Sequence, residues 1–228
     1  TLKLPGNRVI LNAGARVDYF SGIKKNIAAS PRFGVSYSLF ANTTLSASTG
    51  IYYQSPEYIW LTADPRNENL KFIQANHLVV GIEHLFTPEL RLSIEAYYKD
   101  YKNYPVSTVI PTYVFISSGT DNGPNLMYGE AVSEGKGISR GIDFSLHKKL
   151  TGNGFYGMIN YSLSDSRVTA LVGGEKPGSF DYRHNLTIIA GYQLTNDWLV
   201  GLKFRYTTGR PYTPFDINAS TIAGRGVS

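Results

Sequence analysis

Two glutamates and four histidines are the residues of this sequence with the clearest capacity for catalysis or metal binding. Glu83 and Glu95 fall opposite each other if the chain turns around Glu89, and paired carboxylates can act as general acid and base. The histidines form neither an HExxH motif nor an i, i+4 pair, so they do not indicate a metal site. Residues 135–141 are rich in glycine but lack the spacing and the following helix of a nucleotide-binding loop. We therefore expect the two glutamates to be solvated or bonded to basic residues rather than catalytic.

The composition argues further against an enzyme or a nucleic-acid-binding protein. The 228 residues include no cysteine, and no Ser-His-Asp order carries a recognisable nucleophile elbow. The net charge of +5 is mild, and its lysines and arginines are scattered rather than clustered. No apolar run reaches the ~18–20 residues that a transmembrane helix needs. We expect no enzyme activity, no cofactor, no bound metal and no nucleic-acid partner.

The elements that must position these residues are β-strands, because apolar residues recur with a period of two. In residues 8–19 the odd positions from Val9 to Tyr19 are apolar, whereas all but one of the even positions are polar or small. A strand of this length is long for a soluble sheet and matches the ~9–11 tilted residues that cross a bilayer. The pattern returns eight times, with apolar faces at residues 33–39, 45–53, 78–82, 92–98, 138–146, 159–163, 186–194 and 198–206.

The expected connections alternate in length along the chain. Short connections fall at residues 40–43, 87–90, 150–154 and 195–197, and long ones at residues 21–29, 55–73, 103–135 and 166–181. Such alternation is typical of a transmembrane barrel, which has tight periplasmic turns and long external loops. A soluble β-sandwich has no reason to sort its loops in this way.

Two hairpin registers can be predicted from the apolar faces. Pairing Leu194 with Trp198 makes one continuous apolar face across the last hairpin, with Lys203 and Arg205 on the other face. Pairing Leu39 with Leu45 similarly places Phe33 beside Ile51, residue 34 beside residue 50 and residue 32 beside residue 52.

Aromatic residues collect at the two ends of the expected strands. Amphipathic rings favour the two boundaries of an apolar band, although aromatic residues also have a high intrinsic strand propensity. We expect a membrane-interface role for Phe40, Phe86, Phe155 and Trp198 near the short turns, and for Tyr53, Tyr98 and Tyr206 near the long loops.

Several short motifs, taken in order, resemble the strands of TonB-dependent outer-membrane transporters. Residues 14–19 (GARVDY) are similar to the "G-x-R-x-D/Y-aromatic" strand, and residues 31–37 (PRFGVSY) to the "P-R-x-G-x-x-Y" strand start. Residues 95–101 (EAYYKDY) resemble the "A-Y-Y-x-D-Y" hairpin partner. Residues 180–185 (FDYRHN) and 208–214 (TGRPYTP) are similar to late-barrel motifs. Each motif is weak alone, and their order covers nearly the whole chain.

The resemblance implies an all-β, antiparallel, up-and-down transmembrane β-barrel, of which residues 1–228 supply about nine strands of a larger, roughly 22-strand barrel. It implies a place in the bacterial outer membrane, an N-terminal plug domain outside this chain, and a TonB-type energy-coupling protein. The implied function is uptake of a scarce ligand such as a siderophore, cobalamin or an oligosaccharide. The sequence shows no plug, no closing C-terminal strand and no signal peptide, so we expect a partial barrel domain. Outer-membrane lipid, lipopolysaccharide and a surface lipoprotein are further expected partners.

Ligand contacts are expected from lumen-facing residues high in the wall and from the long loops. Aromatic and arginine side chains suit flat or anionic ligands, whereas basic groups at the outer rim are equally suited to lipopolysaccharide phosphates. The candidate ligand-binding residues are Tyr52, Gln54, Tyr97, Lys99, Arg167 and Arg183, and the other expected lumen-facing residues are Arg16, Glu83, Glu95, Lys203 and Arg205.

Three alternatives stay open at this point. A passive porin or a barrel enzyme would share the long alternating strands, and the enzyme would need a convergent Ser/His or Asp/His site. A soluble β-sandwich binding module would pack two apolar sheet faces against each other.

Overall fold

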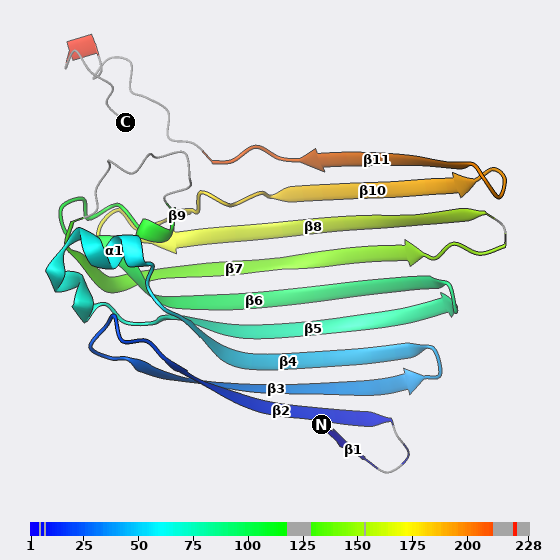
Figure 1. Ribbon diagram of the computed structural model, residues 1–228, viewed down its shortest axis with the longest axis horizontal. Coiled ribbons are helices and arrows are strands. Elements are labelled where there is room, and N and C mark those ends of the chain that lie inside the picture. Colours follow the sequence, from blue (N-terminus) through cyan, green and yellow to red (C-terminus); the bar gives the residue numbers. More distant parts are fainter. Residues whose placement is uncertain (5, 7, 118–128, 153, 212–220, 223–228) are drawn as a thin grey trace.

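A computed structural model describes residues 1–4, 6, 8–117, 129–152, 154–211 and 221–222. The described residues form one 11-stranded antiparallel sheet in the order β1-β2-β3-β4-β5-β6-β7-β8-β10-β11, with β9 paired to β8 (Figure 1). Consecutive strands are neighbours, as in an up-and-down barrel wall. The expected all-β fold is therefore confirmed, and a single sheet is incompatible with the β-sandwich alternative.

Nine of these strands are long and correspond to the nine that the sequence predicts. Two very short strands, one α-helical turn and two 3-10 turns add to them. The elements are β1 (Leu2–Lys3), β2 (Val9–Tyr19), β3 (Ile27–Phe40), β4 (Thr43–Gln54), α1 (Tyr58–Ala63), η1 (Pro65–Asn69), β5 (Ile73–Thr87), β6 (Leu90–Ser107), η2 (Phe115–Ser117), β7 (Ala131–Lys148), β8 (Phe155–Thr169), β9 (Glu175–Pro177), β10 (His184–Gln193) and β11 (Leu199–Thr207).

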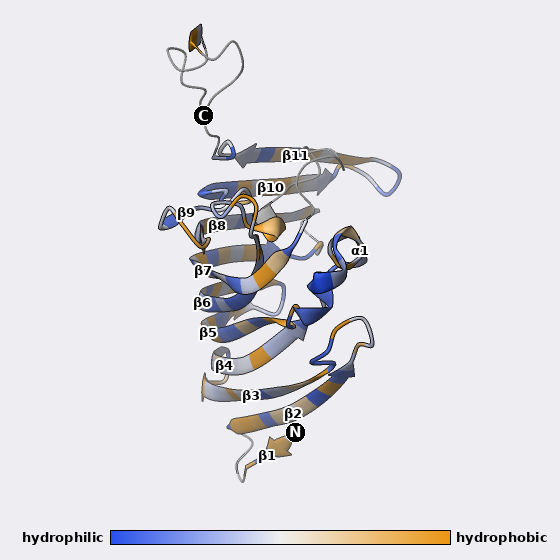
Figure 2. Cartoon of the chain, turned by 90° about the vertical axis from the view of Figure 1, so that its left-hand side faces the viewer, coloured by the Kyte–Doolittle hydropathy of each residue, from blue (hydrophilic) through white to orange (hydrophobic). Residues whose placement is uncertain are grey.

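The sheet is curved, and its two faces differ in character. Figure 2 shows α1 on the concave side of the sheet and β9 on the convex side. Large apolar side chains such as Phe33, Leu78 and Leu202 are exposed, with 49%, 52% and 69% of their surface accessible. They share one face through the strand register, and an exposed apolar face of this size requires a nonaqueous neighbour. The convex face is the lipid side, and the concave face is the lumen.

The last hairpin has the register that the sequence predicts. Tyr192 pairs with Val200, Ile188 with Phe204 and Ile189 with Lys203. The amide of Leu194 also donates to the carbonyl of Trp198 across the turn, at 2.9 Å.

The β3–β4 hairpin differs from its prediction by two residues. Tyr37 pairs with Leu45 and Phe33 with Thr49, whereas the prediction paired Leu39 with Leu45 and Phe33 with Ile51. One residue of the shift comes from the turn, where Phe40 pairs with Thr43, and the second comes from a bulge between Ser38 and Phe40. Because the shift is even, every side chain keeps its predicted face.

The strands also reach further from the short turns than the sequence predicts. β6 continues to Ser107 and β7 begins at Ala131, so much of the loop expected at residues 103–135 is strand. Pro105, which has no amide proton, is accommodated because the β6–β7 register shifts on either side of Tyr104. Similarly, β3 begins at Ile27 and β8 runs to Thr169, which shortens two other expected loops. The sequence also predicts that residues 210–228 begin an external loop, and most of that range lies outside the described residues.

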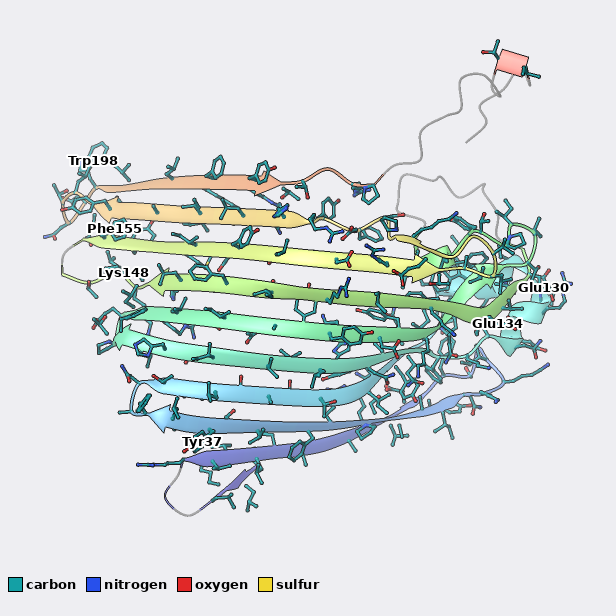
Figure 3. The ribbon with its side chains drawn as sticks, turned by 180° about the vertical axis from the view of Figure 1, so that it is seen from behind. Tyr37, Glu130, Glu134, Lys148, Phe155 and Trp198 are labelled. Atoms are coloured by element: carbon teal, nitrogen blue, oxygen red, sulfur yellow. The ribbon has the colours of Figure 1, made fainter. Side chains whose placement is uncertain are left out.

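A small buried core lies at the long-loop end of the wall, and we call it the outer cap. Figure 3 distinguishes the two ends, with Lys148, Phe155 and Trp198 near the short turns and Glu130 and Glu134 at the opposite end. The cap joins α1, η1 and η2 to the outer ends of β6 and β7. Its buried members are Ile23, Ala28, Trp60, Leu70, Phe72, Ile73, Tyr104, Val106, Val114, Phe115 and Ala131.

The polar centre of the outer cap is Asn67, whose side chain is fully buried. Its amide group donates to the carbonyls of Trp60 at 2.7 Å and Gly129 at 2.9 Å. Its carbonyl oxygen accepts from the amide of Ala131 at 2.8 Å. One side chain thus connects α1, η1 and β7, and a buried polar group is tolerated because both of its N–H groups and its oxygen have hydrogen-bond partners.

Candidate functional site

The luminal face carries a depression of about 400 Å³ in its outer half. Its walls come from β5, β6, β7, β8 and the chain that leads into β10. The lining residues are Val79, Glu95, Tyr97, Lys99, Asp143, Ser162, Ser164, Phe180, Tyr182 and Asn185. Two predicted ligand-binding residues, Tyr97 and Lys99, are therefore part of one concave surface, together with the predicted luminal Glu95.

Tyr97 lies across the neighbouring strand because a glycine stands there. Tyr97 pairs with Gly141 of β7, and a Cβ atom added to Gly141 would lie 2.6 Å from the Tyr97 hydroxyl. The same added atom would lie 2.5 Å from the carbonyl oxygen of Leu163. Only glycine leaves room for the Tyr97 ring at this position. The absence of a side chain at residue 141 therefore lets the ring form the aromatic floor of the depression.

The depression contains both signs of charge. The Lys99 ammonium lies 4.9 Å from the centre of the Tyr97 ring, within the range of a cation–π contact. Glu95 pairs in register with Asp143 of β7. Among the described residues, Lys99 and these two carboxylates form no ion pair within 4.0 Å. One ammonium group and two carboxylates can therefore bind a ligand.

The predicted pairing of Glu83 with Glu95 is wrong. Glu95 pairs with Gly81, and Glu83 pairs with Ser93. The turn pairs Thr87 with Leu90, one residue away from the predicted register, and a bulge between Leu85 and Thr87 shifts the pairing by one residue more. Glu83 instead lies 3.5 Å from the guanidinium of Arg91, so a basic neighbour meets it as the sequence indicates.

A row of cations and rings extends from the depression across four strands. The Arg32 guanidinium lies 4.5 Å from the centre of the Tyr52 ring, and Tyr52 stacks on His77 with centroids 4.3 Å apart. His77 pairs in register with Lys99, which covers Tyr97. We call these five residues the luminal row. It joins three predicted ligand-binding residues to His77, which the sequence does not single out, and to Arg32, which is predicted beside Tyr52 but not as a ligand contact.

Gln54 belongs to a separate depression of about 220 Å³ nearer the outer end of β2 and β4. Arg16 and Asp18 line the same depression and form an ion pair at 2.5 Å. Lys203 and Arg205 pair with Ile189 and Thr187, on the face opposite the apolar stripe of β10 and β11. Their luminal positions agree with the sequence pattern.

Arg167 and Arg183 do not join the luminal row. Arg167 is in register with Ile138 of β7, and its strand neighbour Leu163 is in register with Ile142, so Arg167 shares the convex face with these apolar residues. Arg183 binds Asp165, which is on that same face, at 3.0 Å. Arg167, expected in the long loop at residues 166–181, is therefore part of a strand, because the alternation of the wall continues to the outer end of β8. A ligand-binding role for either arginine stays a prediction.

Most of the predicted interface aromatics lie near the ends of the strands. Phe40, Phe86, Phe155 and Trp198 are exposed beside the short turns, and Tyr206 is exposed at the other end of β11, whereas Tyr98 is exposed in the middle of β6. Tyr53 differs, because it packs against the outer cap with its ring centroid 6.3 Å from that of Phe72.

Asp64 and Arg66 hold the η1 turn of the outer cap. The Asp64 carboxylate accepts hydrogen bonds from the Arg66 backbone amide at 2.9 Å and from the guanidinium at 2.9 and 2.7 Å. Arg66 also forms an ion pair with Glu130 at 2.8 Å. The side-chain hydrogen bonds from Arg66 lower the pKa of Asp64 from 3.8 to about 2.

The lowered pKa of Asp64 predicts acid sensitivity of the η1 turn. A carboxylate with a depressed pKa stabilises the folded state above pH ~4, and this contribution disappears as the pH falls toward 2. We expect the amides of Arg66 and Asn67 to lose protection against hydrogen exchange over that interval, after correction for intrinsic rates. An Asp64→Asn variant should show the weaker protection already at pH 5. Equal protection in both proteins at pH 5 would contradict this role.

No helix among the described residues is long and apolar enough to cross a membrane. Across the same part of the chain, no group of three or more histidine or acidic side chains could hold a metal ion.

A curved wall of long antiparallel strands, with a lipid-facing convex side and a polar concave side, defines part of a large outer-membrane β-barrel. The model of the family described as TonB dependent receptor-like, beta-barrel, matches residues 1–227. The chain therefore belongs to the TonB-dependent receptor β-barrel family, whose members are bacterial outer-membrane transporters and receptors.

Solved structures of this architecture resemble the chain at low sequence identity. The outer-membrane transporter YddB from Escherichia coli matches with a TM-score of 0.69 and 14% identity, over 96% of this chain and 34% of that one. The ferripyoverdine receptor of Pseudomonas aeruginosa bound to ferripyoverdine matches with a TM-score of 0.64 and 14% identity, over 90% and 29%. The ferric enterobactin receptor PfeA from Pseudomonas aeruginosa, as a double mutant, gives a TM-score of 0.64 and 19% identity, over 90% and 30%.

The chain thus spans about a third or less of each of these structures. A search of curated proteins finds no match.

Proposed function

We propose that this chain forms wall and vestibule of a transporter that uses TonB-type energy coupling to take up a scarce ligand. Siderophores, cobalamin and oligosaccharides are the ligand classes considered, and the ferric-siderophore receptors among the similar structures favour the first. A plug domain and the energy-coupling protein, both outside this chain, complete the transporter. The residues of the wall bind and orient the ligand and carry out no covalent chemistry.

The luminal row is the observation that carries this proposal. It presents Arg32 and Lys99 above the faces of Tyr52 and Tyr97, with the His77 ring between the two pairs. Ring faces bind flat groups by stacking, and the guanidinium and ammonium groups bind anionic oxygens. Within the described residues neither Arg32 nor Lys99 has a carboxylate within ion-pair distance, so both cations remain available to a ligand.

Binding and uptake by the complete transporter test the proposal. Cells that express it would be supplied with ⁵⁵Fe-labelled ferric enterobactin, ⁵⁵Fe-labelled ferripyoverdine or radiolabelled cobalamin. For the probe that the wild type imports, we expect Lys99→Gln and Tyr97→Leu each to reduce uptake about tenfold, the loss of roughly one charge-assisted contact. Lys102→Gln is the matched control, because Lys102 is on the same strand and bonds only Asp100, at 3.7 Å, among the described residues.

Energy coupling separates this function from a passive porin. A protonophore should stop accumulation of the probe while leaving its binding at the cell surface intact. Accumulation that continues at the same rate with the protonophore would refute the proposal and favour the porin. Equal uptake by the Lys99→Gln, Tyr97→Leu and Lys102→Gln variants would remove the luminal row from the binding site.

A further inference from the structure

The convex face carries a cluster of arginines where a lipid-facing wall would be expected to be apolar. Arg140 and Asp165 pair in register between β7 and β8, directly beyond the pair formed by Ile142 and Leu163. Asp165 also binds Arg167 at 3.1 Å and Arg183 at 3.0 Å. The luminal row does not include this cluster, and the proposed transport does not use it.

The cluster lies at the height of the outer boundary of the membrane. Phe155 begins β8 beside a short turn, and Asp165 is about ten residues further along the same strand. With a rise of about 3.3 Å per residue and a tilt of about 40°, that distance corresponds to about 25 Å along the membrane normal. This is the height of the apolar band of an outer-membrane barrel, so the three guanidiniums lie where lipid headgroups begin.

The arrangement of the charges directs the positive groups outward. The Asp165 and Asp181 side chains are 9% and 5% exposed, whereas those of Arg140 and Arg183 are 58% and 44% exposed. Formally, Asp165, Asp181 and Glu175 balance the three arginines. The two aspartates are nevertheless buried behind the guanidiniums, so they hold these groups in place while the guanidiniums form much of the surface.

The free edges of the guanidiniums suit a phosphate. Arg140 uses Nε and Nη2 to bind one oxygen of Asp165, at 3.1 and 3.0 Å. Arg183 binds Asp165 and Asp181 through Nη2. Each arginine thus keeps N–H groups that can donate to an anion, and arginine favours phosphate through paired hydrogen bonds.

An apolar surface adjoins the cations. A depression of about 340 Å³ is lined by Arg140, Ile142, Leu163, Asp165 and Arg183, among others. Ile142 is 50% exposed and Leu163 is 37% exposed. A ligand with a phosphorylated head and hydrocarbon chains would place the head against the guanidiniums and the chains along the apolar residues.

We propose that Arg140, Arg167 and Arg183 form a binding site for a phosphorylated lipid of the outer leaflet, of the lipid A type. The site is on the outside of the wall and is independent of the transported ligand.

The complete barrel in nanodiscs tests this proposal without any mutation. Nanodiscs would contain either bisphosphorylated lipid A or the same lipid after enzymatic removal of its phosphates, and bound lipid would be counted by native mass spectrometry. We expect at least tenfold more retained lipid A than dephosphorylated lipid. Equal retention of the two lipids would overturn the proposal, as would release of lipid A by millimolar inorganic phosphate, which would indicate a site for free anions.

Variants then assign the effect to the cluster. Arg140→Gln/Arg183→Gln should lower lipid A retention about tenfold, and Arg91→Gln is the matched control. Arg91 is likewise about half exposed and, within the described part of the chain, bonds one carboxylate, that of Glu83 at 3.5 Å, near a short turn. Heat-dependent mobility on gels would show that each variant is a folded barrel. Undiminished retention by the folded double variant would contradict the assignment.

Discussion

Gly141→Ala is expected to destabilise the barrel wall and to weaken ligand binding about tenfold. The added methyl group would lie 2.5 Å from the Leu163 carbonyl oxygen and 2.6 Å from the Tyr97 hydroxyl. The carbonyl belongs to the β7–β8 ladder and cannot move alone, so the strands must separate locally at a cost of about 1–3 kcal/mol. The Tyr97 ring must leave Gly141 at the same time, which changes the floor of the depression. Thermal unfolding and probe uptake measure the two effects.

Gly14→Ala is the matched control for this prediction. Gly14 pairs with Arg32 on the luminal side of β2, and an added Cβ atom would have no atom of the described residues within 4 Å. Combining Gly141→Ala with Tyr97→Leu should recover part of the lost stability, because only the clash with Leu163 remains. Identical unfolding temperatures for Gly141→Ala and Gly14→Ala would show that the wall tolerates a side chain beneath Tyr97.

Asn67→Ala is expected to release the outer cap from the wall. The substitution leaves the carbonyls of Trp60 and Gly129 and the amide of Ala131 without their buried partner. Each unsatisfied buried group costs about 1–3 kcal/mol, so a total loss of about 3 kcal/mol or more is expected in the cap. Hydrogen exchange across α1, η1 and the start of β7 should accelerate by about two orders of magnitude, while the middle of the wall keeps its protection.

Asn69→Ala provides the comparison within the same turn. The Asn69 side chain is exposed and bonds the carbonyl of Arg66 at 2.8 Å and the ammonium of Lys24 at 2.9 Å. Water can replace both partners, so a change below about 0.5 kcal/mol is expected. If the Asn67 and Asn69 variants exchange at the same rate, the buried amide does not hold the cap.

The faces of the strands could be predicted from sequence because alternation is a local property. Phe33, Leu78 and Leu202 are exposed on one face as their spacing indicates, and the hairpin of Tyr192 and Val200 has its predicted register. Registers beside two short turns could not be predicted, because bulges at residues 38–40 and 85–87 each displace the pairing. A bulge depends on local backbone geometry and leaves no fixed residue pattern.

The functional residues likewise divide into those that local sequence spacing predicts and those that depend on contacts between distant parts of the chain. Tyr97 and Lys99 could be predicted as ligand-binding residues from their place in the strand pattern. His77 and Arg32 join them only through contacts between strands. A usable signal for the outward arginines does exist. Arg140 stands between Ile138 and Ile142 in the same alternation, and Asp165 and Arg167 follow Leu163 at spacings of two. The outer cap leaves no such signal, because Asn67 and Ala131 meet across distant parts of the chain.

The outer cap has a consequence for how the barrel is assembled. Ile23, Trp60 and Val106 come from three different hairpins, yet they belong to one buried cluster on the far side of the apolar band from the short turns. The band is stabilised by lipid, whereas the cluster is stabilised by its exclusion from water. The cluster is therefore complete only when all three hairpin tips lie together on the same side of the bilayer. Once it is formed, none of the three tips can return through the apolar band without breaking it.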